Sequence, residues 1–234
     1  MFDGNMRDQV DRGLEPLGEA LRAIGVTADI VTITGITMSA AAAIVIGSGN
    51  LAVGLVLMVL TGVPDALDGA VAKASGTSSL RGAYFDSVSD RLTDIMLFGG
   101  VAWYLSDTRD SQIHMLPVGV MGVALMISYQ RAKAESLGFD AKGGLMERAE
   151  RFIALGIGLF LGAFNDDLLI AVLWIMFALT AITAIQRFLK VWKQASEVRP
   201  QTGQRPVDRR RARQARQAQR EPLAERWRNF QDRR

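Results

Sequence analysis

Four aspartates at two short, regular spacings are the residues of this 234-residue chain best suited to do chemistry. Asp65 and Asp68 lie three positions apart at the end of one apolar stretch, and Asp86 and Asp90 lie four apart at the start of the next. Residues at these spacings share one face of a helix, so each pair presents its carboxylates together. The connecting segment is short, which predicts that the two helices are antiparallel neighbours with their pairs facing each other.

Carboxylates grouped at membrane depth require a positive partner, because an ionisable residue there costs at least about 2.5–3.5 kcal/mol. No lysine or arginine lies within the helical pairs, and the chain has no cysteine and only one histidine. Hard oxygen ligands select Mg²⁺, Mn²⁺ or Ca²⁺. We therefore infer a divalent metal site of two ions, a common device for displacement at phosphorus. Helix-end charges at the water interface would explain one or two of the aspartates, but not all four.

Long apolar stretches must position these aspartates. A bilayer core about 30 Å thick needs about 20 apolar residues in a helix, and no charged residue occurs between Asp29 and Asp65. Six segments approach this length: 29–48, 50–69, 85–105, 114–134, 150–166 and 168–190. The sequence therefore predicts an all-α integral membrane protein with six transmembrane helices.

Basic residues are distributed unequally among the loops between these segments. The loops after the first, third and fifth segments carry lysine or arginine only at Arg109. Those after the second and fourth carry, in or beside them, Lys73, Arg81, Arg131, Lys133, Lys142, Arg148 and Arg151. The positive-inside rule then predicts a multi-pass protein of the cell membrane, with both termini and the four aspartates on the cytoplasmic side.

The two ends of the chain differ from its apolar middle, residues 27–195, which we expect to form the membrane domain. Residues 1–26 carry an apolar stripe at intervals of three or four, which predicts a cytoplasmic amphipathic helix in the membrane interface or packed on its own protein. Residues 196–234 are rich in arginine, so we expect a disordered tail that either contacts anionic headgroups or fixes topology. This tail accounts for the net charge of +3, which therefore does not indicate a nucleic-acid partner.

The carboxylate region has a long and specific pattern. The chain contains Asp65-x2-Asp68-Gly69-x2-Ala72-Lys73-x8-Gly82-x3-Asp86-x3-Asp90, which resembles the signature of the CDP-alcohol phosphotransferases. Lys73 stands where the family has arginine, so the charge is kept and the bidentate fork is lost. The resemblance implies a six-helix, homodimeric membrane enzyme that uses Mg²⁺ or Mn²⁺.

The resemblance also implies a role for each matching residue. Asp65 and Asp86 would bridge both ions, while Asp68 would complete the shell of the first. Asp90 would complete the shell of the second ion and deprotonate the acceptor hydroxyl. Contacts with the CDP-linked donor are implied for Gly69, Lys73 and Ser79 and, in a stretch similar to the family's Thr-Pro-Asp-x-x-Thr, for Asp29, Ile30, Val31 and Thr32. Ala28 replaces the proline of that stretch.

A second group of basic residues lies on the predicted cytoplasmic side. Arg131 and Lys133 end the fourth segment, Arg148 and Arg151 share a face at the start of the fifth, and Arg187 lies near the end of the sixth. Arginine binds phosphate through paired hydrogen bonds, so we interpret the group as a binding site for an acceptor phosphate. The alternative is a set of ordinary positive-inside residues.

The stretches 128–135 and 143–151 look like those of the actinobacterial phosphatidylinositol phosphate synthases. That resemblance implies transfer of a phosphatidyl group from CDP-diacylglycerol to inositol phosphate, with release of CMP. Glycerol 3-phosphate synthases share the Glu-Arg feature of the fifth segment, so phosphatidylglycerophosphate synthase is the alternative. A divalent-cation transporter is the alternative from another class, but its acids should lie near the bilayer midplane rather than at one membrane face.

Overall fold

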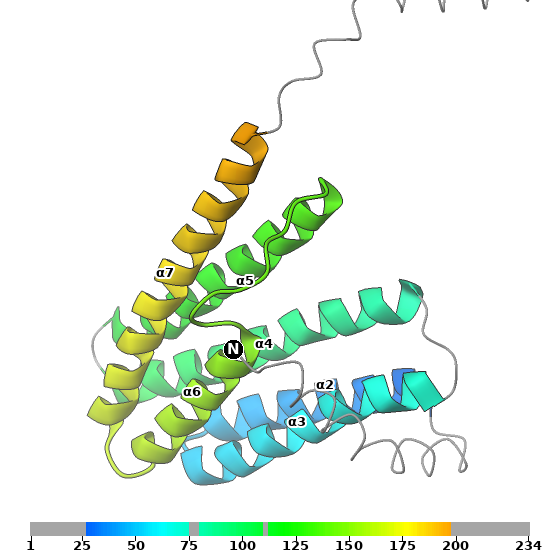
Figure 1. The fold of residues 1–234 in the computed structure, drawn as a ribbon. Helices are drawn as coiled ribbons and strands as arrows, with labels where there is room; N and C mark the ends of the chain where they lie inside the picture. Colours follow the sequence, from blue (N-terminus) through cyan, green and yellow to red (C-terminus); the bar gives the residue numbers. More distant parts are fainter. Residues whose placement is uncertain (1–26, 75–79, 110–111, 198–234) are drawn as a thin grey trace, which may run out of the picture. The chain divides into compact units, whose positions relative to one another are not determined.

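The computed structural model describes residues 27–74, 80–109 and 112–197, with residues 28 and 63–74 described as backbone only. The described residues form six α-helices and one 3₁₀ turn, without β-strands (Figure 1). The elements are α2 (Ala28–Gly47), α3 (Leu51–Ala74), α4 (Leu80–Thr108), the turn η1 (Gln112–His114), α5 (Met115–Ser136), α6 (Arg148–Gly162) and α7 (Asp166–Glu197). The predicted amphipathic helix of residues 1–26 and most of the basic tail lie outside the described residues.

The chain divides into residues 1–192 and residues 193–234. The site described below belongs to the first unit. Of the second unit, the structure describes only the last residues of α7.

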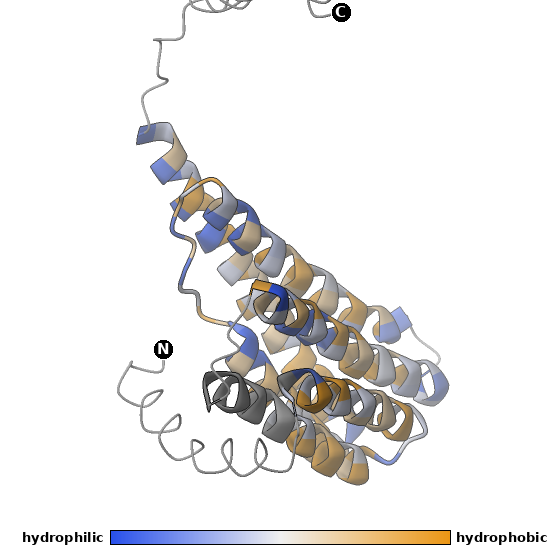
Figure 2. Ribbon diagram, turned by 90° about the vertical axis from the view of Figure 1, so that its right-hand side faces the viewer, coloured by the Kyte–Doolittle hydropathy of each residue, from blue (hydrophilic) through white to orange (hydrophobic). Residues whose placement is uncertain are grey.

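The helices match the predicted segments closely, and the all-α class is confirmed for the described residues. Three of them are long and apolar enough to cross a membrane: Asp29–Gly47, Gln112–Ser136 and Asp166–Glu197. The 15 residues of α6 extend about 22 Å, less than a bilayer core, whereas the 32 residues of α7 extend about 48 Å. Figure 2 shows apolar residues along the helices and polar residues gathered towards their ends. The count of six membrane spans stays a prediction.

Packing among the helices places α2 against both α3 and α4, α4 against α5, and α3 against α6. Their shared core contains side chains from different helices, among them the fully buried Ile46, Met58, Leu97, Leu155 and Leu173. Many large apolar side chains on the outer faces are exposed. That pattern fits helices surrounded by lipid tails, which are as apolar as leucine.

The crossing of α2 and α4 is a close backbone contact. A Cβ atom on Gly100 would lie 2.5 Å from the carbonyl oxygen of Ala43, so only glycine allows this approach. Ser39 donates a hydrogen bond to Thr93 at the same interface, with 3.3 Å between the oxygens. The beginning of α4 consequently lies beside the beginning of α2.

The other end of α4 is joined to the start of α7. The Tyr104 hydroxyl donates a hydrogen bond to Asp166, and Arg109 Nη2 lies 2.8 Å from Asp167 Oδ1. At 1.5 Å per residue, this junction begins at Tyr104, about 21 Å from Asp90 along the axis of α4. It therefore offers control positions remote from the predicted site.

Candidate functional site

A cavity of about 740 Å³ is lined by residues from all six described helices and from the loop between α5 and α6. Thr61 and Gly62 of α3 line the same cavity as Ser89 of α4, so both helices expected to carry the aspartates contribute to it. The charged residues that line it are Asp90, Arg91, Asp94, Arg131, Lys142, Glu147, Arg148, Glu150, Arg151 and Arg187. Ten charged side chains of the described residues thus line one cavity.

Asp90, the predicted base, lines this cavity from α4. Its Oδ1 atom lies 3.0 Å from Nη2 of Arg148, and its Oδ2 atom lies 3.5 Å from Nη1 of Arg91. The Asp90 side chain is only 18% exposed. The first turn of α6 therefore brings a predicted phosphate ligand into direct contact with the predicted base.

The other three predicted metal ligands are described to different depths. Asp86 is exposed one turn before Asp90 on α4. Asp65 and Asp68 lie in the last part of α3, where only the backbone is described, and their spacing puts them on one helix face. Among described side chains there is no group of three or more potential ligands. The facing of the two pairs accordingly stays a prediction.

The predicted donor residues begin at the start of α2. Thr27 caps this helix, because its Oγ1 accepts a hydrogen bond from the backbone nitrogen of Ile30 at 3.3 Å. Thr32 lines the cavity and Val31 is buried beside it in sequence, whereas Ile30 is exposed. Asp29 Oδ2 lies 2.8 Å from Nη2 of Arg81, which ties the first turns of α2 and α4 together.

The remaining predicted donor residues, Gly69, Lys73 and Ser79, are not described at the level of side chains. Gly69 and Lys73 belong to the backbone-only part of α3, and Ser79 lies outside the described residues. Their contacts with a donor stay predictions.

Arg151 is buried in the wall of the cavity, with 4% of its side chain exposed. Its Nη2 atom lies 3.0 Å from Oδ2 of Asp94, and its Nη1 atom donates to the carbonyl oxygen of Met146 at 3.3 Å. Nε is buried and has no hydrogen-bond partner among the described residues. The guanidinium is thus fixed on one edge and unsatisfied on another.

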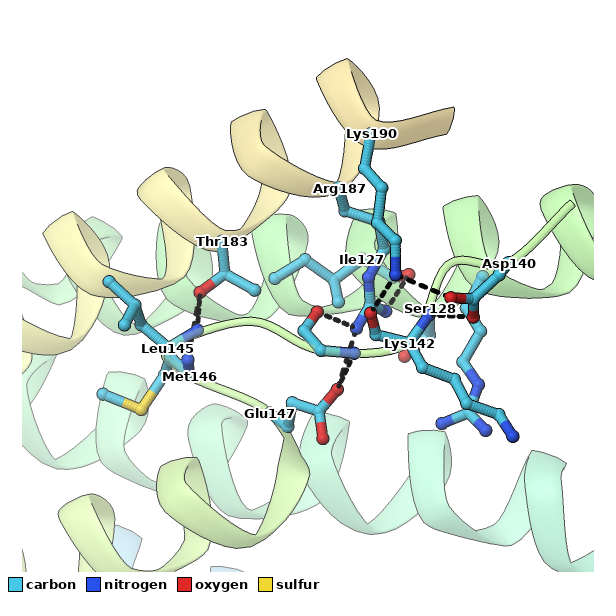
Figure 3. A network of polar contacts seen from close by, with 12 residues as sticks. Ile127, Ser128, Asp140, Lys142, Leu145, Met146, Glu147, Thr183, Arg187 and Lys190 are labelled. Carbon is cyan, nitrogen blue, oxygen red and sulfur yellow. Dashed lines mark hydrogen bonds and ion pairs between the residues drawn. The ribbon is translucent and has the colours of Figure 1, made fainter. Parts of the chain in front are cut away.

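Arg187 of α7 is held in a similar way by the loop between α5 and α6 (Figure 3). Its Nη2 atom donates to Gly143 O and to Glu147 Oε1, both at 3.1 Å. Its Nη1 atom donates to Ile127 O, also at 3.1 Å. The Arg187 side chain is 3% exposed, so one buried guanidinium joins α5, the loop and α7.

Thr183, one turn before Arg187, fixes the middle of the same loop. Its Oγ1 atom accepts hydrogen bonds from the backbone nitrogens of Leu145 at 3.2 Å and Met146 at 3.0 Å (Figure 3). Gly144 has φ +155°, and a Cβ atom there would lie 2.4 Å from Thr183 Cγ2. Glycine is therefore required for the loop to approach α7 this closely.

Lys190 fixes the beginning of the loop. Its Nζ atom donates to Asp140 Oδ2 at 2.7 Å and to the carbonyl oxygen of Lys142 at 2.8 Å (Figure 3). The hydrogen bond from Lys190 lowers the pKa of Asp140, and the backbone N–H of Lys142 lowers it further. Three side chains of α7 consequently hold one wall of the cavity in place.

The predicted phosphate ligands are largely brought together. Arg131, Arg148, Arg151 and Arg187 all line the cavity. Lys133 does not line it and is exposed on the last turn of α5.

Five described charged residues of the cavity are not among the predicted site residues: Arg91, Asp94, Lys142, Glu147 and Glu150. Asp94 continues the four-residue spacing of Asp86 and Asp90, a signal that could have identified it. Glu147 precedes Arg148 and could have been suspected as its neighbour, whereas Lys142 lies in an irregular loop and is indicated only as a basic residue of a predicted cytoplasmic loop.

Residues 25–186 match the CDP-alcohol phosphatidyltransferase family, in agreement with the all-helical fold and the cavity around Asp90. The chain therefore belongs to this family of membrane enzymes and is a CDP-alcohol phosphatidyltransferase. It is 34% identical over 187 residues to the phosphatidylinositol phosphate synthase of Mycobacterium marinum, covering 77% of this chain and 80% of the relative. It is also 34% identical over 191 residues to the archaetidylinositol phosphate synthase of Methanothermobacter thermautotrophicus, covering 80% and 93%.

The fold is similar to crystal structures of Mycobacterium tuberculosis phosphatidylinositol phosphate synthase. The structure with CDP-DAG bound has a TM-score of 0.73 and 30% identity and covers 83% of this chain and 98% of that chain. A second structure, in complex with manganese and citrate, has the same TM-score and identity and covers 82% and 92%. The similarity therefore extends over more than four fifths of this chain.

Proposed function

We propose that this chain transfers the phosphatidyl group of CDP-diacylglycerol to a hydroxyl of inositol phosphate and releases CMP. The observation that carries this proposal is the cavity in which Asp90 lies beside Arg148, with Arg131, Arg151 and Arg187 in the same wall. A proton acceptor and a set of phosphate ligands in one chamber suit an acceptor that carries both a hydroxyl and a phosphate.

The reaction makes few covalent demands on the protein. Asp90 takes the proton of the acceptor hydroxyl, and the hydroxyl oxygen attacks the β-phosphorus of the donor. The bond from this phosphorus to the oxygen that bridges the two phosphates then breaks, and CMP leaves with that oxygen. Most of the catalytic effect therefore comes from positioning the two substrates and from stabilising charge.

A divalent cofactor fits the chemistry of the four predicted ligands. Asp65, Asp68, Asp86 and Asp90 offer only carboxylate oxygens, the donors that Mg²⁺ and Mn²⁺ prefer. We propose that these four aspartates hold two such ions, and manganese in a related crystal structure supports this assignment. When bound, the ions supply positive charge that stabilises the phosphate oxygens during displacement.

Removal of divalent ions tests the cofactor. EDTA should stop CMP release by the purified protein, and Mg²⁺ or Mn²⁺ added in excess should restore it. Ca²⁺, which tolerates longer and more variable coordination, serves as the comparison ion. Full activity after exhaustive chelation, checked by elemental analysis of the protein, would contradict the proposed metal site.

The acceptor is the part of the proposal that most needs a direct test. The similar proteins include a phosphatidylinositol phosphate synthase and an archaetidylinositol phosphate synthase, whose names give two different lipid groups. Inositol phosphate is the headgroup that both names share, which supports inositol phosphate as the acceptor here. Phosphatidylglycerophosphate synthesis, with glycerol 3-phosphate as acceptor, is the competing assignment.

An acceptor panel separates the two assignments. Purified protein with CDP-diacylglycerol should release CMP with inositol phosphate, and much more slowly with glycerol 3-phosphate, inositol or serine. The lipid product should carry the label of radioactive inositol phosphate. A preference for glycerol 3-phosphate would overturn the acceptor assignment and leave the reaction class intact.

We further propose that the site faces the cytoplasm and that two copies of the chain form a homodimer in the bilayer. The unequal distribution of basic residues between loops supports the orientation. The dimer is an expectation from the family to which the chain belongs. Cross-linking in native membranes at low expression tests it directly.

A further inference from the structure

Two ion pairs connect α4 and α6 in parallel. Asp90 pairs with Arg148, and Asp94 pairs with Arg151, each with 3.0 Å between oxygen and nitrogen. The acids are four positions apart on α4, and the arginines are three apart on α6, so each step is about one helical turn. The second pair therefore repeats the first, one turn deeper in the helices.

The second pair is the more buried of the two. Arg151 is 4% exposed and Asp94 is 14% exposed, compared with 32% for Arg148 and 18% for Asp90. Both members of the second pair line the cavity. Asp94 and the carbonyl of Met146 fix the two terminal nitrogens of Arg151, while Nε has no hydrogen-bond partner among the described residues. A buried donor left unsatisfied is costly, so the guanidinium depends on Asp94 and Met146 for its hydrogen bonds. Because Nε is not exposed to the cavity, an anionic ligand there would interact with the positive charge of the guanidinium rather than with Nε.

Charge alone gives Asp94 no favourable role towards such a ligand. The described lining contains six basic and four acidic side chains, and the excess of two positive charges matches a phosphate monoester, which carries about −1.5 to −2. An additional carboxylate repels that anion. Any benefit from Asp94 must therefore come from the orientation that it gives to Arg151.

We propose that Asp94 is a positioning residue for the acceptor phosphate, which holds the Arg151 guanidinium in the geometry that binds it. This inference rests on the proposed function, because it assumes that a phosphorylated acceptor occupies the cavity. Simple electrostatics predicts that removing the Asp94 carboxylate strengthens phosphate binding, and the positioning role predicts the opposite. Loss of the Asp94 carboxylate should weaken phosphate binding, although it makes the cavity more positive.

The test measures KM for the acceptor, KM for CDP-diacylglycerol and kcat in wild type, Asp94→Ala, Arg151→Ala and the double variant. Asp94→Ala should raise the acceptor KM by about tenfold or more, because a charge-assisted hydrogen bond is lost. The donor KM should stay within about twofold. The double variant should have the acceptor KM of Arg151→Ala, since Asp94 acts through Arg151. Asp94→Asn keeps one acceptor oxygen and should recover part of the loss.

Asp167→Asn is the matched control. It removes a carboxylate from the ion pair with Arg109 at the far end of α4 and should leave all three constants unchanged. A fall in kcat with unchanged KM values in Asp94→Ala would indicate a smaller folded fraction and overturn the positioning role. An unchanged or lowered acceptor KM would also overturn it, as would additive effects in the double variant.

Inhibition by inorganic phosphate separates this inference from the choice of acceptor. Phosphate should compete with whichever acceptor supports CMP release, and its inhibition constant should rise in Asp94→Ala as the acceptor KM does. If glycerol 3-phosphate replaces inositol phosphate as acceptor, the proposed substrate fails while this test still applies. If phosphate does not compete with the acceptor in the wild-type protein, the positioning role itself is overturned.

Discussion

Asp90 contacts the guanidiniums of Arg148 and Arg91 while it lines the cavity. A carboxylate in this position can accept a proton from a hydroxyl in the cavity. Asp94 also lines the cavity at the same four-residue spacing, but its carboxylate pairs with the buried Arg151. The proposed mechanism therefore depends on one proton acceptor. Loss of the Asp90 carboxylate should therefore slow the chemical step rather than weaken the binding of the donor.

Replacement of Asp90 by asparagine tests this role. Asp90→Asn keeps the size of the side chain but cannot accept the proton, so kcat should fall by about 10²–10⁴-fold or more. Insertion into membranes and binding of CDP-diacylglycerol should persist. Asp107→Asn, which removes the charge of the carboxylate that accepts a hydrogen bond from Trp103 at the other end of α4, is the control. Normal turnover by Asp90→Asn would eliminate the proposed base.

At the residue scale, the sequence predicts which residues line the cavity better than it predicts which ion pairs they form. Basic residues recur on one side of the predicted membrane, which predicts a phosphate site that includes Arg131, Arg148, Arg151 and Arg187, and all four line the cavity. The pairing of Arg151 with Asp94 depends on how α4 and α6 are rotated about their axes. Side-chain spacing within either helix does not determine that rotation, so the pairing could not be predicted.

At the scale of elements, the loop between α5 and α6 depends on α7 for its conformation. Thr183, Arg187 and Lys190 contact it in succession, and Gly144 allows its closest approach. The loop contributes Lys142, Gly143 and Glu147 to the cavity. Its position should therefore affect acceptor binding more than donor binding.

Gly144→Ala tests this dependence. The added Cβ atom would lie 2.4 Å from Thr183 Cγ2, so the loop must move away from α7. We expect a lower thermal midpoint and a raised acceptor KM, measured by thermal shift and steady-state kinetics. Gly122→Ala is the control because a Cβ atom there meets nothing within 4 Å, and alanine in a helix is favoured by about 1 kcal/mol. Equal behaviour of the two variants would contradict the role of the loop.

The contact between Asp140 and Lys190 should make the loop sensitive to acid. Because the folded state lowers the pKa of Asp140, the contact stabilises the loop above the ordinary pKa of aspartate, about 3.9. That stabilisation is lost as the pH falls through the lower pKa of the folded state. Hydrogen exchange in residues 137–147 should accelerate in that range, and Asp140→Asn should exchange quickly at every pH. Identical profiles for the two proteins would contradict this assignment.

Helix positions were predictable because long apolar stretches separated by polar residues leave few alternatives in a bilayer. The first predicted segment, 29–48, corresponds to α2 at Ala28–Gly47, and the last, 168–190, lies within α7 at Asp166–Glu197. The ends of α4 and α7 extend beyond the predicted segments. Polar side chains there are stabilised by partners distant in sequence, such as Arg109 with Asp167, which apolar periodicity does not reveal.

At the scale of the whole molecule, the asymmetric distribution of basic residues predicts which loops face the cytoplasm. The absence of cysteine from the chain makes this prediction straightforward to test. Ser106→Cys, at the end of α4, should react with an impermeant thiol reagent in intact cells. Leu137→Cys, after α5, should react only once the membrane is permeabilised. The reverse labelling pattern would require the opposite orientation.

The anchoring of the α5–α6 loop to α7 also limits how this enzyme can be re-engineered. A chimera that received only residues 137–147 from a relative with another acceptor would present a foreign segment to Thr183, Arg187 and Lys190. Its backbone could still bond to these side chains, but Lys190 and Arg187 would lose their carboxylate partners unless the segment carries acids at positions 140 and 147, and Thr183 would clash with any residue other than glycine at position 144. Substrate preference should therefore transfer best when residues 137–147 are exchanged together with positions 183, 187 and 190.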